Sequence, residues 1–406
     1  MSVSKSPLIV ALTGPIGSGV TTLSHVLKQH NFHRVSLSEL IKEVYRKRHG
    51  LEAGAPIPFT PGQRKELQDI GDEGREKSLS HWLEVALEGL PSERDVVIDC
   101  VRNTGEIEAI RDRFTKSYVV AVVANRTARW DRSKSNYGTE GEFAEADERD
   151  NEDKDERPYG QQVSRCVNAA DYVLTNDAPL GSSGNVNKGL WEKISTDLDV
   201  MRGIAPRRPR DEETHMATAY TASHLSLCLK RKVGCVIVGA DSLPLSTGFN
   251  ENPLGTQPCV REWGYCFKDD AMEKELEERK ESHCTKCGAI NHFPGGGWRC
   301  AGCKDSLKKQ LFPSRNMEKC TAIHAEERAI RSLGDRSAKG GTMYMTTFPC
   351  LQCSRYILDA GIKKIVYVEA YPVKEARELL ERFRVEFVPF NGFKARAFNI
   401  VFRSGT

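Results

Sequence analysis

Cysteines are concentrated in one part of this 406-residue chain, where eleven of the thirteen lie between Cys228 and Cys353. Residues 1–10 lack the long apolar core of a secretory signal, so we expect a reducing, cytoplasmic compartment. In such a compartment, clustered cysteines indicate metal ligands before disulfides. The second half of the chain is therefore expected to fold around metal sites, whereas the first half holds only Cys100 and Cys166.

The strongest chemical pattern is His324-x-Glu326 followed by Pro349-Cys350-x-x-Cys353. His324, Cys350 and Cys353 would hold Zn²⁺ and leave the fourth tetrahedral position to water, whose pKa the metal lowers toward neutrality. Glu326 would take the proton of that water and pass it to the ring nitrogen and the leaving ammonia. Ordinary core or redox residues are the alternative. The order, the spacing and the proline agree instead with the pattern of zinc nucleobase deaminases.

The segment around this pattern resembles the dCMP deaminase family over about residues 212–390. Residues 231–238 (RKVGCVIV) look like the first strand of that family, and residues 248–250 (GFN) look like the end of its second strand. Residues 367–371 (YVEAY) look like the strand that follows the zinc helix. By this resemblance Asn250 contacts the sugar of the substrate. A turn residue is the alternative reading of Asn250.

Two further C-x-x-C pairs indicate a structural zinc ribbon, inserted at about residues 280–306. All four ligand positions would be filled by protein, so this second zinc should not be catalytic. The alternatives are a substitute ligand from Cys259, Cys266 or His283, or free thiols in a loop. The four expected ligands are Cys284, Cys287, Cys300 and Cys303.

A glycine-rich turn at residues 14–21 (GPIGSGVT) follows the first apolar run and precedes a helical pattern. Its spacing is that of the phosphate loop G-x-x-x-x-G-K-[ST], but Val20 stands at the lysine position, which makes it a degenerate Walker A sequence. The backbone could still cradle phosphate, and Thr21 could still reach Mg²⁺. Kinase turnover should be weak unless Lys28 or Arg129 replaces the missing cation. A plain strand–helix turn is the alternative. The candidate nucleotide-binding residues are Gly14, Gly17, Ser18, Gly19, Val20, Thr21 and Thr22.

Apolar runs alternate with helical patterns along the whole chain, which predicts an α/β protein with helices packed on its sheets. The chain is expected to divide near residue 205, where residues 203–210 (GIAPRRPR) look like a linker. The acidic residues 139–157 predict a mobile lid or a solvated loop. Expected strands lie at 8–12, 95–98, 118–124, 171–174, 233–238, 342–346 and 365–368. Expected helices lie at 21–30, 37–48, 61–90, 104–114, 214–229, 322–333, 350–360 and 374–383.

Other features of the first half resemble the adenylate-kinase-like nucleotide kinases. Residues 36–38 (SLS) stand where such kinases begin their monophosphate-binding helices, and residues 97–99 (VID) look like a Walker B type site for Mg²⁺. Arg129 and Arg132 begin a region that looks like a lid, although surface charge is a slightly better reading of each arginine alone. The resemblance implies a P-loop kinase-like parallel sheet over residues 1–204.

That domain, joined to a cytidine-deaminase-like α/β/α domain at residues 205–406 with a ribbon insertion, resembles the bacterial anti-phage dCTP deaminases, also called antiviral cytidine deaminases. The resemblance implies a hydrolase acting on cyclic amidine C–N bonds, which converts dCTP and dCMP to uracil nucleotides and drains dCTP during phage infection. It implies that the first domain is a sensor or inhibitory module, for which ATP, GTP or a dNTP is the candidate ligand. It also implies an inhibitory RNA or protein partner and a homo-oligomer.

Three alternatives remain open at this stage. A cytosine deaminase of single-stranded nucleic acid would need a basic channel with stacking aromatics, whereas the net charge is only +3 from 59 basic and 56 acidic residues. A plain dCMP deaminase of pyrimidine metabolism and a nucleotide-binding regulatory or toxin–antitoxin module are the other two. Residues 230–232 (KRK) could bind a triphosphate or form a solvated cluster. No apolar run approaches the roughly 18 residues of a membrane helix, so no membrane partner is expected.

Overall fold

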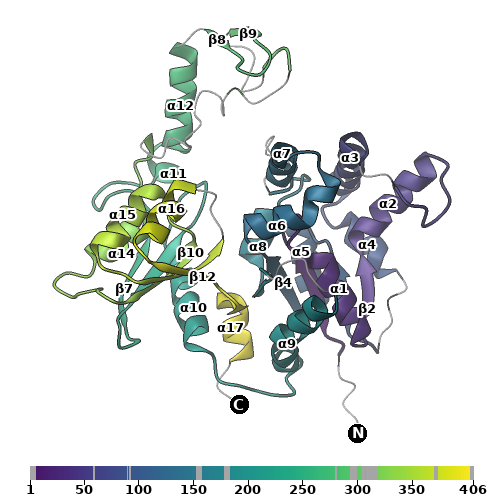
Figure 1. Cartoon of the computed structure of the whole chain (residues 1–406), viewed down its shortest axis with the longest axis horizontal. Coiled ribbons are helices and arrows are strands. Elements are labelled where there is room, and N and C mark those ends of the chain that lie inside the picture. The colour runs from purple at the N-terminus through teal and green to yellow at the C-terminus, as the bar shows by residue number, and fades with distance from the viewer. Residues whose placement is uncertain are drawn as a thin grey trace. The chain divides into compact units, whose positions relative to one another are not determined.

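A computed structural model of the chain divides by its internal contacts into two compact units, which are described separately (Figure 1). The first unit consists of Met1–Ala217, Tyr367–Ala370 and Val388–Thr406, and the second of Thr218–Val366 and Tyr371–Phe387. This division differs from a single cut near residue 205, because the last part of the chain belongs to the first unit. The structure describes residues 6–57, 60–88, 90, 93–151, 158–177, 183–278, 281–292, 300–303, 307, 319–369 and 374–402.

The first unit is built on a six-stranded sheet whose order is β13-β5-β4-β1-β3-β2. The pairs β1–β3, β1–β4, β2–β3 and β4–β5 are all parallel, whereas β13 is antiparallel to β5. All five residues of β1 are buried, as expected for a strand covered on both faces. The strands are β1 (Ile9–Thr13), β2 (His33–Ser36), β3 (Val96–Asp99), β4 (Ser117–Val123), β5 (Tyr172–Thr175) and β13 (Gly392–Phe393).

Helices cover both faces of this sheet, and the side chains of β1 alternate between two cores. Leu12 lies in the core shared with α1 and α9, whereas Ala11 lies in the core shared with α2, α4, α5 and α8. The connection after β1 therefore runs over one face and the connection after β3 over the other. The carboxyl ends of these adjacent strands form a topological switch point, where α/β proteins bind ligands. The helices are α1 (Val20–Gln29), α2 (Leu37–Arg48), α3 (Pro61–Lys77), α4 (His81–Leu87), α5 (Thr104–Arg113), α6 (Arg126–Ser133), η1 (Lys134–Asn136), α7 (Glu140–Asn151), α8 (Val163–Ala169) and α9 (Ser183–Arg202).

Two expectations for the first unit differ from the structure. The single helix expected at 61–90 is two helices, because Ser78 is extended and α4 folds back so that the indole of Trp82 donates to the carbonyl of Gly71 at 2.9 Å. The acidic stretch, expected to be a lid or loop, contains the helix α7. Ion pairs such as Asp147 with Arg129 explain why so acidic a segment is ordered. Residues 152–157 of this stretch lie outside the described residues.

The end of the chain completes the sheet of the first unit. Phe393 of β13 packs edge-to-face on Tyr172, with ring centroids 5.0 Å apart. The helix α17 (Ala395–Val401) follows and buries Ala397 in the same core. Lys394 is 2% exposed and donates to the carbonyls of Val167 and Asn168 at 2.8 and 2.7 Å. Residues 392–401 therefore pack in the core of the first unit, whereas the sequence alone assigned them to the second domain.

The second unit is built on a five-stranded sheet in the order β12-β11-β10-β6-β7, so the mixed α/β fold expected for this half is confirmed. The strand β6, which lies between β10 and β7, is antiparallel to both of them. The expected helix at 214–229 ends earlier, at Ser223. The strands are β6 (Gly234–Val238), β7 (Pro244–Phe249), β10 (Thr342–Thr347), β11 (Lys364–Glu369) and β12 (Glu386–Pro389). The helices are α10 (Asp211–Ser223), α14 (Ala325–Arg331), α15 (Leu351–Asp359) and α16 (Lys374–Arg382).

An insertion between β7 and α14 carries the remaining elements of the second unit. It contains α11 (Cys259–Glu262), α12 (Phe267–Glu278) and the two-stranded sheet of β8 (Glu281–His283) and β9 (Ile290–His292). None of the helices in the described part of the chain is both long enough and apolar enough to cross a membrane.

Candidate functional site

His324, Cys350 and Cys353 form a compact cluster in the second unit. The Nδ1 atom of His324 lies 3.5 Å from Sγ of Cys350 and 3.3 Å from Sγ of Cys353. The three ligand atoms all lie within 4.8 Å of one another. Two thiols and one imidazole are the donor set that favours Zn²⁺, and three protein ligands leave one tetrahedral position open. The residues present therefore fit the catalytic zinc that their spacing predicts.

The local structure explains why these three residues meet. His324 is the N-cap of α14, and Cys350 is the N-cap of α15 directly after β10. The backbone N–H of Cys353 donates to Sγ of Cys350 at 3.4 Å. Hydrogen bonds from the Cys353 thiol and from His324 lower the pKa of Cys350 to about 4. Helix starts supply free N–H groups that favour a thiolate, which is the form that binds metal.

Glu326 lies one residue into α14 and is 4% exposed. Burial raises the pKa of its carboxyl to about 7, while the charge of His324 acts in the opposite direction. A carboxyl group beside a metal cluster, with its pKa near neutrality, can both accept and donate a proton. The structure thus places Glu326 beside the cluster, as its spacing from His324 predicts.

The helix that carries Glu326 packs unusually closely on β7. A Cβ atom at Gly248 would lie 2.1 Å from the carbonyl oxygen of Ala325, so only glycine allows this approach. From the same helix, Arg328 donates to the carbonyls of Phe249 and Glu251 at 3.0 Å each. Arg328 was not singled out from the sequence. Its position four residues after His324, on the same side of a helix, is the one signal that could have indicated it.

The side chain of Asn250 is held by backbone groups. Its Oδ1 accepts from the N–H of Val233 at 2.7 Å, and its Nδ2 donates to the carbonyl of Arg231 at 2.9 Å. These bonds join the end of β7 to the segment before β6, which is the structural role that a turn residue would have. The proposed contact of Asn250 with a sugar stays a prediction. Nearby, Lys230 forms an ion pair with Asp269 at 2.5 Å.

The four ribbon cysteines also come together. Sγ of Cys284 lies 3.6 Å from that of Cys303, and Sγ of Cys287 lies 3.5 Å from that of Cys300. All four sulfur atoms lie within 4.8 Å of one another. In the described part of this insertion, the two strands have three residues each, and the buried cluster beside them consists of Cys284, Cys300 and Leu307. A Cys₄ metal site would staple such a small core.

The glycine-rich loop lies at the switch point of the first unit, between β1 and α1. Gly17 and Gly19 have φ values of 75° and 104°, a region in which other residues are strained. Val20 is partly buried and packs against the hydrophobic core between β1 and α1, and it offers no positive charge to the loop. Ser18 is fully buried, and its Oγ has no hydrogen-bond partner within the described part of the chain. The loop therefore adopts the positive φ values for which its glycines are suited, and binding of phosphate by its backbone stays a prediction.

Arginines of α6 hold this loop in place. Arg129 donates to the carbonyl of Ile16 at 3.1 Å, and Arg132 donates to the carbonyl of Gly17 at 3.1 Å. Arg129 also binds both carboxylate oxygens of Asp147 at 2.5 and 2.8 Å. Of the two proposed substitutes for the missing lysine, Arg129 thus lies at the loop. Lys28 is exposed in the last turn of α1.

The expected Mg²⁺-site residue Asp99 ends β3, beside the loop. Its Oδ2 accepts from Oγ of Ser24 at 2.6 Å and from Arg34 at 2.5 Å. Asp99 is fully buried, so Arg34 neutralises a carboxylate that would otherwise be costly to bury. In this arrangement Asp99 is part of an ion pair, and its contact with Mg²⁺ stays a prediction.

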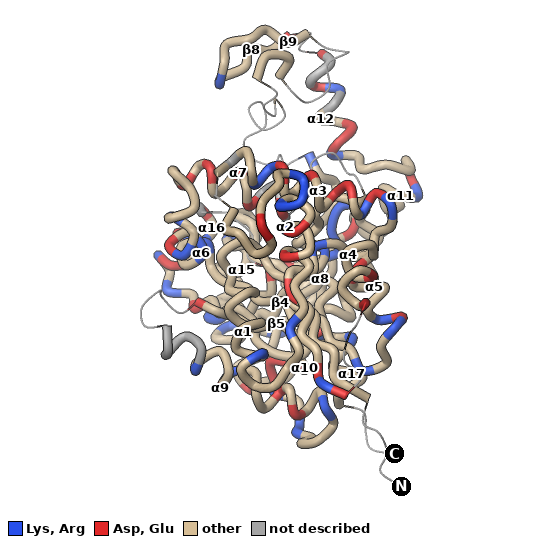
Figure 2. Tube along the Cα trace, turned by 90° about the vertical axis from the view of Figure 1, so that its right-hand side faces the viewer, with Lys and Arg blue, Asp and Glu red and all other residues tan. Residues whose placement is uncertain are grey.

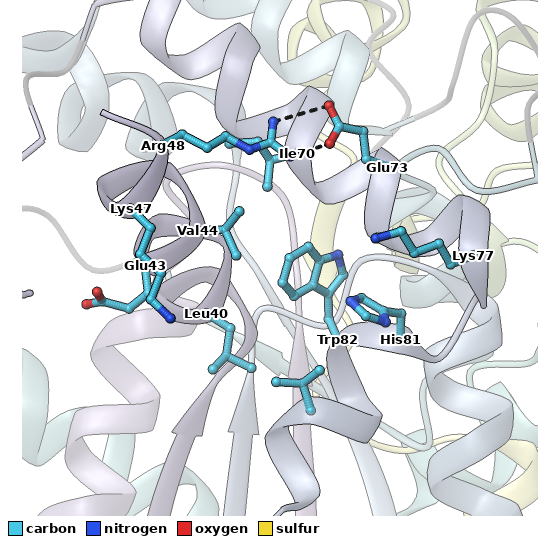
Figure 3. Close-up of a pocket in the computed structure, with 12 residues that line it drawn as sticks. Leu40, Glu43, Val44, Lys47, Arg48, Ile70, Glu73, Lys77, His81 and Trp82 are labelled. Carbon is cyan, nitrogen blue, oxygen red and sulfur yellow. Dashed lines mark hydrogen bonds and ion pairs between the residues drawn. The ribbon is translucent and has the colours of Figure 1, made fainter. Parts of the chain in front are cut away.

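A pocket of about 250 Å³ opens elsewhere in the first unit, between α2, α3 and α4 (Figure 3). Its walls include Leu40, Val44 and Trp82, and the ion pair of Arg48 with Glu73 crosses its upper side. No residue predicted to bind nucleotide or metal lines it. Its lining is mixed, with apolar side chains and with charged ones from α2 and α3.

Comparison with known proteins identifies the second unit. The family model described as "Cytidine and deoxycytidylate deaminase zinc-binding region" matches residues 209–369. The deoxycytidylate deaminase of Saccharomyces cerevisiae is 31% identical over 46% of this chain and 48% of its own length. The chain thus spans about half the length of this relative.

Two other relatives match over most of their length. The deoxycytidylate deaminase of Enterobacteria phage T4 is 31% identical over 39% of this chain and 77% of its own length. The deoxycytidylate deaminase of Homo sapiens is 32% identical over 47% of this chain and 83% of its own length. With this similarity and the clustered residues His324, Cys350 and Cys353, the chain belongs to the deoxycytidylate deaminase family.

Proposed function

We propose that this chain is a zinc-dependent hydrolytic deaminase of free deoxycytidine nucleotides. The observation that carries the proposal is the cluster of His324, Cys350 and Cys353 with the buried Glu326 beside it, in a member of the deoxycytidylate deaminase family. The family relationship supports dCMP as a substrate. The further substrate dCTP is proposed on the resemblance of the whole chain to the anti-phage dCTP deaminases.

The proposed reaction replaces the 4-amino group of cytosine with oxygen from water and releases ammonia. Zinc held by His324, Cys350 and Cys353 would supply the Lewis acid that makes water nucleophilic near neutral pH. Glu326 takes a proton from the attacking water and delivers it to the ring nitrogen N3, and then carries a second proton to the departing amino group. Its burial keeps bulk water away from this transfer.

The test uses the purified full chain with dCMP, dCTP, cytidine and a single-stranded oligonucleotide, and follows the uracil product by chromatography. Conversion of dCMP and dCTP supports the proposal. Conversion of dCMP but not of dCTP would indicate a plain dCMP deaminase. Conversion of the oligonucleotide alone would indicate a nucleic-acid deaminase and would overturn it.

We also propose that the first unit binds a nucleotide, with ATP, GTP and a dNTP as the candidates, and regulates the deaminase. The proposal is supported by the course of the chain, which passes directly from β12 of the deaminase sheet to β13 of the first unit. Thr175 of β5 contacts this segment: its Oγ1 donates to the carbonyl of Phe390 at 3.0 Å, and its N–H donates to Asn391 at 3.2 Å. The next residue, Asn176, donates to the carbonyl of Ser18 in the glycine-rich loop at 2.8 Å. Two adjacent residues thus contact the loop and the segment that leads to the deaminase sheet.

The biological role that we propose is depletion of dCTP in phage-infected cells. It rests on the same whole-chain resemblance, which also implies a homo-oligomer and an inhibitory RNA or protein partner. Phage plating on cells that carry the chain or its Glu326→Gln variant tests this role. Protection that needs Glu326, with a fall in cellular dCTP, is the expected result, and equal plating on both strains would contradict it. A cytoplasmic location stays a prediction.

A further inference from the structure

The guanidinium group of Arg129 is already occupied by two contacts, and it would have to give up at least one of them to bind a phosphate group. Its Nη1 donates to the carbonyl of Ile16 in the glycine-rich loop at 3.1 Å. Its two Nη atoms bind both carboxylate oxygens of Asp147 at 2.5 and 2.8 Å. The side chains of Arg129 and Asp147 are only 10% and 13% exposed. The carboxylate of Asp147 therefore forms a two-oxygen ion pair with Arg129 at the edge of the loop.

The loop itself has the features of an anion site but lacks its cation. Val20 replaces the lysine that would neutralise a polyphosphate. Ser18 Oγ is buried without a hydrogen-bond partner among the described residues. A Cβ built on Gly14 would lie 2.8 Å from this oxygen, which places the hydroxyl inside the turn of the loop. A buried hydroxyl in this position costs free energy unless a ligand completes its hydrogen bonds.

Arginine recognises carboxylate and phosphate with the same paired N–H···O geometry. Asp147 thus presents to Arg129 the contact that a phosphate group would make. Asp147 belongs to α7, which a second acidic residue also fixes: Asp150 binds Arg102 at 2.5 Å and Gln68 at 2.7 Å. Figure 2 shows acidic and basic positions along α2 and α3 of the first unit.

We propose that the loop binds the polyphosphate of a nucleoside triphosphate with Arg129 in place of the missing lysine, and that Asp147 is an internal anion that holds Arg129 until phosphate replaces it. This inference rests on the proposed nucleotide binding of the first unit. It adds that Arg129 supplies the positive charge and that Asp147 competes with phosphate for Arg129. Displacement of Asp147 by phosphate releases one contact of α7, while the buried ring of Phe143 and the contacts of Asp150 hold the rest of the helix. Nucleotide binding is then read out as loosening of α7.

The test measures binding of ATP and of inorganic tripolyphosphate, each with Mg²⁺, to the full chain by calorimetry. Asp147→Asn removes the competing charge and keeps the shape of the side chain, so both probes should bind about ten times more tightly or better. Arg129→Gln should weaken both at least about tenfold. The matched control is Asp131→Asn on α6, because Asp131 contacts Lys134 on the surface and should leave both affinities unchanged.

Hydrogen exchange of residues 140–151 gives a second readout. ATP should speed exchange there in the original chain and have no effect in Arg129→Gln. Binding in Asp147→Asn that is equal to or weaker than in the original chain overturns the inference, as does full binding in Arg129→Gln. If Arg129→Gln does not fold, binding is measured in Asp147→Asn and in Arg129→Lys, which keeps the positive charge. These two variants still test whether Asp147 competes with phosphate for Arg129. If the original chain shows the expected binding of ATP but does not deaminate dCMP, the proposed deaminase activity is wrong and the inference about Arg129 and Asp147 stands.

Discussion

The Nδ1 atom of His324 lies 3.3 Å from Sγ of Cys353, although 29 residues separate them in the chain. The two residues meet because each stands in or next to the first turn of a helix, and these two helices pack against each other. The ligand cluster is thus a property of two helix starts and needs no ordered loop.

The number of zinc ions bound by the chain and by single cysteine variants should show that the two clusters bind zinc independently. The full chain should contain about two zinc ions, because both donor sets are complete. Cys353→Ser should lower the content to about one and abolish deamination. Cys303→Ser is the matched variant at the ribbon, and it should also leave about one zinc but retain a measurable turnover. Mass spectrometry of the metal content checks this, and two zinc ions in either variant would contradict the assignment of ligands.

Gly248→Ala should destabilise the second unit and reduce activity. Its Cβ would lie 2.1 Å from the carbonyl oxygen of Ala325, so α14, which carries Glu326, must move away from β7. We expect a loss of roughly 1–3 kcal/mol in the free energy of unfolding, as for other overpacked sites. Gly189→Ala on α9 is the control, because nothing lies within 4 Å of its added Cβ. Urea unfolding of both variants checks the difference, and equal stability would show that the close approach is unimportant.

Lys394 should make the stability of the first unit depend on pH. Burial lowers the pKa of its amine to about 7, and the amine donates to the carbonyls of Val167 and Asn168. The unfolded chain, with a lysine pKa of roughly 10.4, binds more protons between these values, so the free energy of unfolding should rise with pH from about 7 to about 10.

The rise should approach about 1.4 kcal/mol per pH unit and should be missing in Lys394→Met. Urea unfolding at pH 7, 8 and 9 therefore gives a difference between the original chain and the variant that grows with pH. A constant difference over this range would show that Lys394 is charged in the folded chain.

The sequence was most informative where chemistry depends on local spacing. The H-x-E and C-x-x-C patterns predict a cluster that the structure assembles, because Cys350 and Cys353 lie three residues apart at a helix start and so share one side of it. The glycines of residues 14–21 likewise predict the turn between β1 and α1, where Gly17 and Gly19 do adopt positive φ values.

Long-range pairing was not predictable in the same way. The two-residue strand β13 has no periodicity of its own, so nothing near Phe393 indicates that it joins a sheet whose nearest strand ends at Thr175. The ordering of α7 depends on arginines far away in the chain, such as Arg102 for Asp150. Composition alone therefore suggested a mobile acidic segment where ion pairs produce a helix.

The role of Glu326 in proton transfer is tested by comparing the full chain with its Glu326→Gln variant on dCMP and dCTP, with zinc measured in the same samples. The variant should keep about two zinc ions per chain and should lose a factor of about 10²–10⁴ in turnover on both nucleotides. Turnover by the zinc-loaded variant close to that of the original chain would contradict the account, because the proton transfer would then not need Glu326.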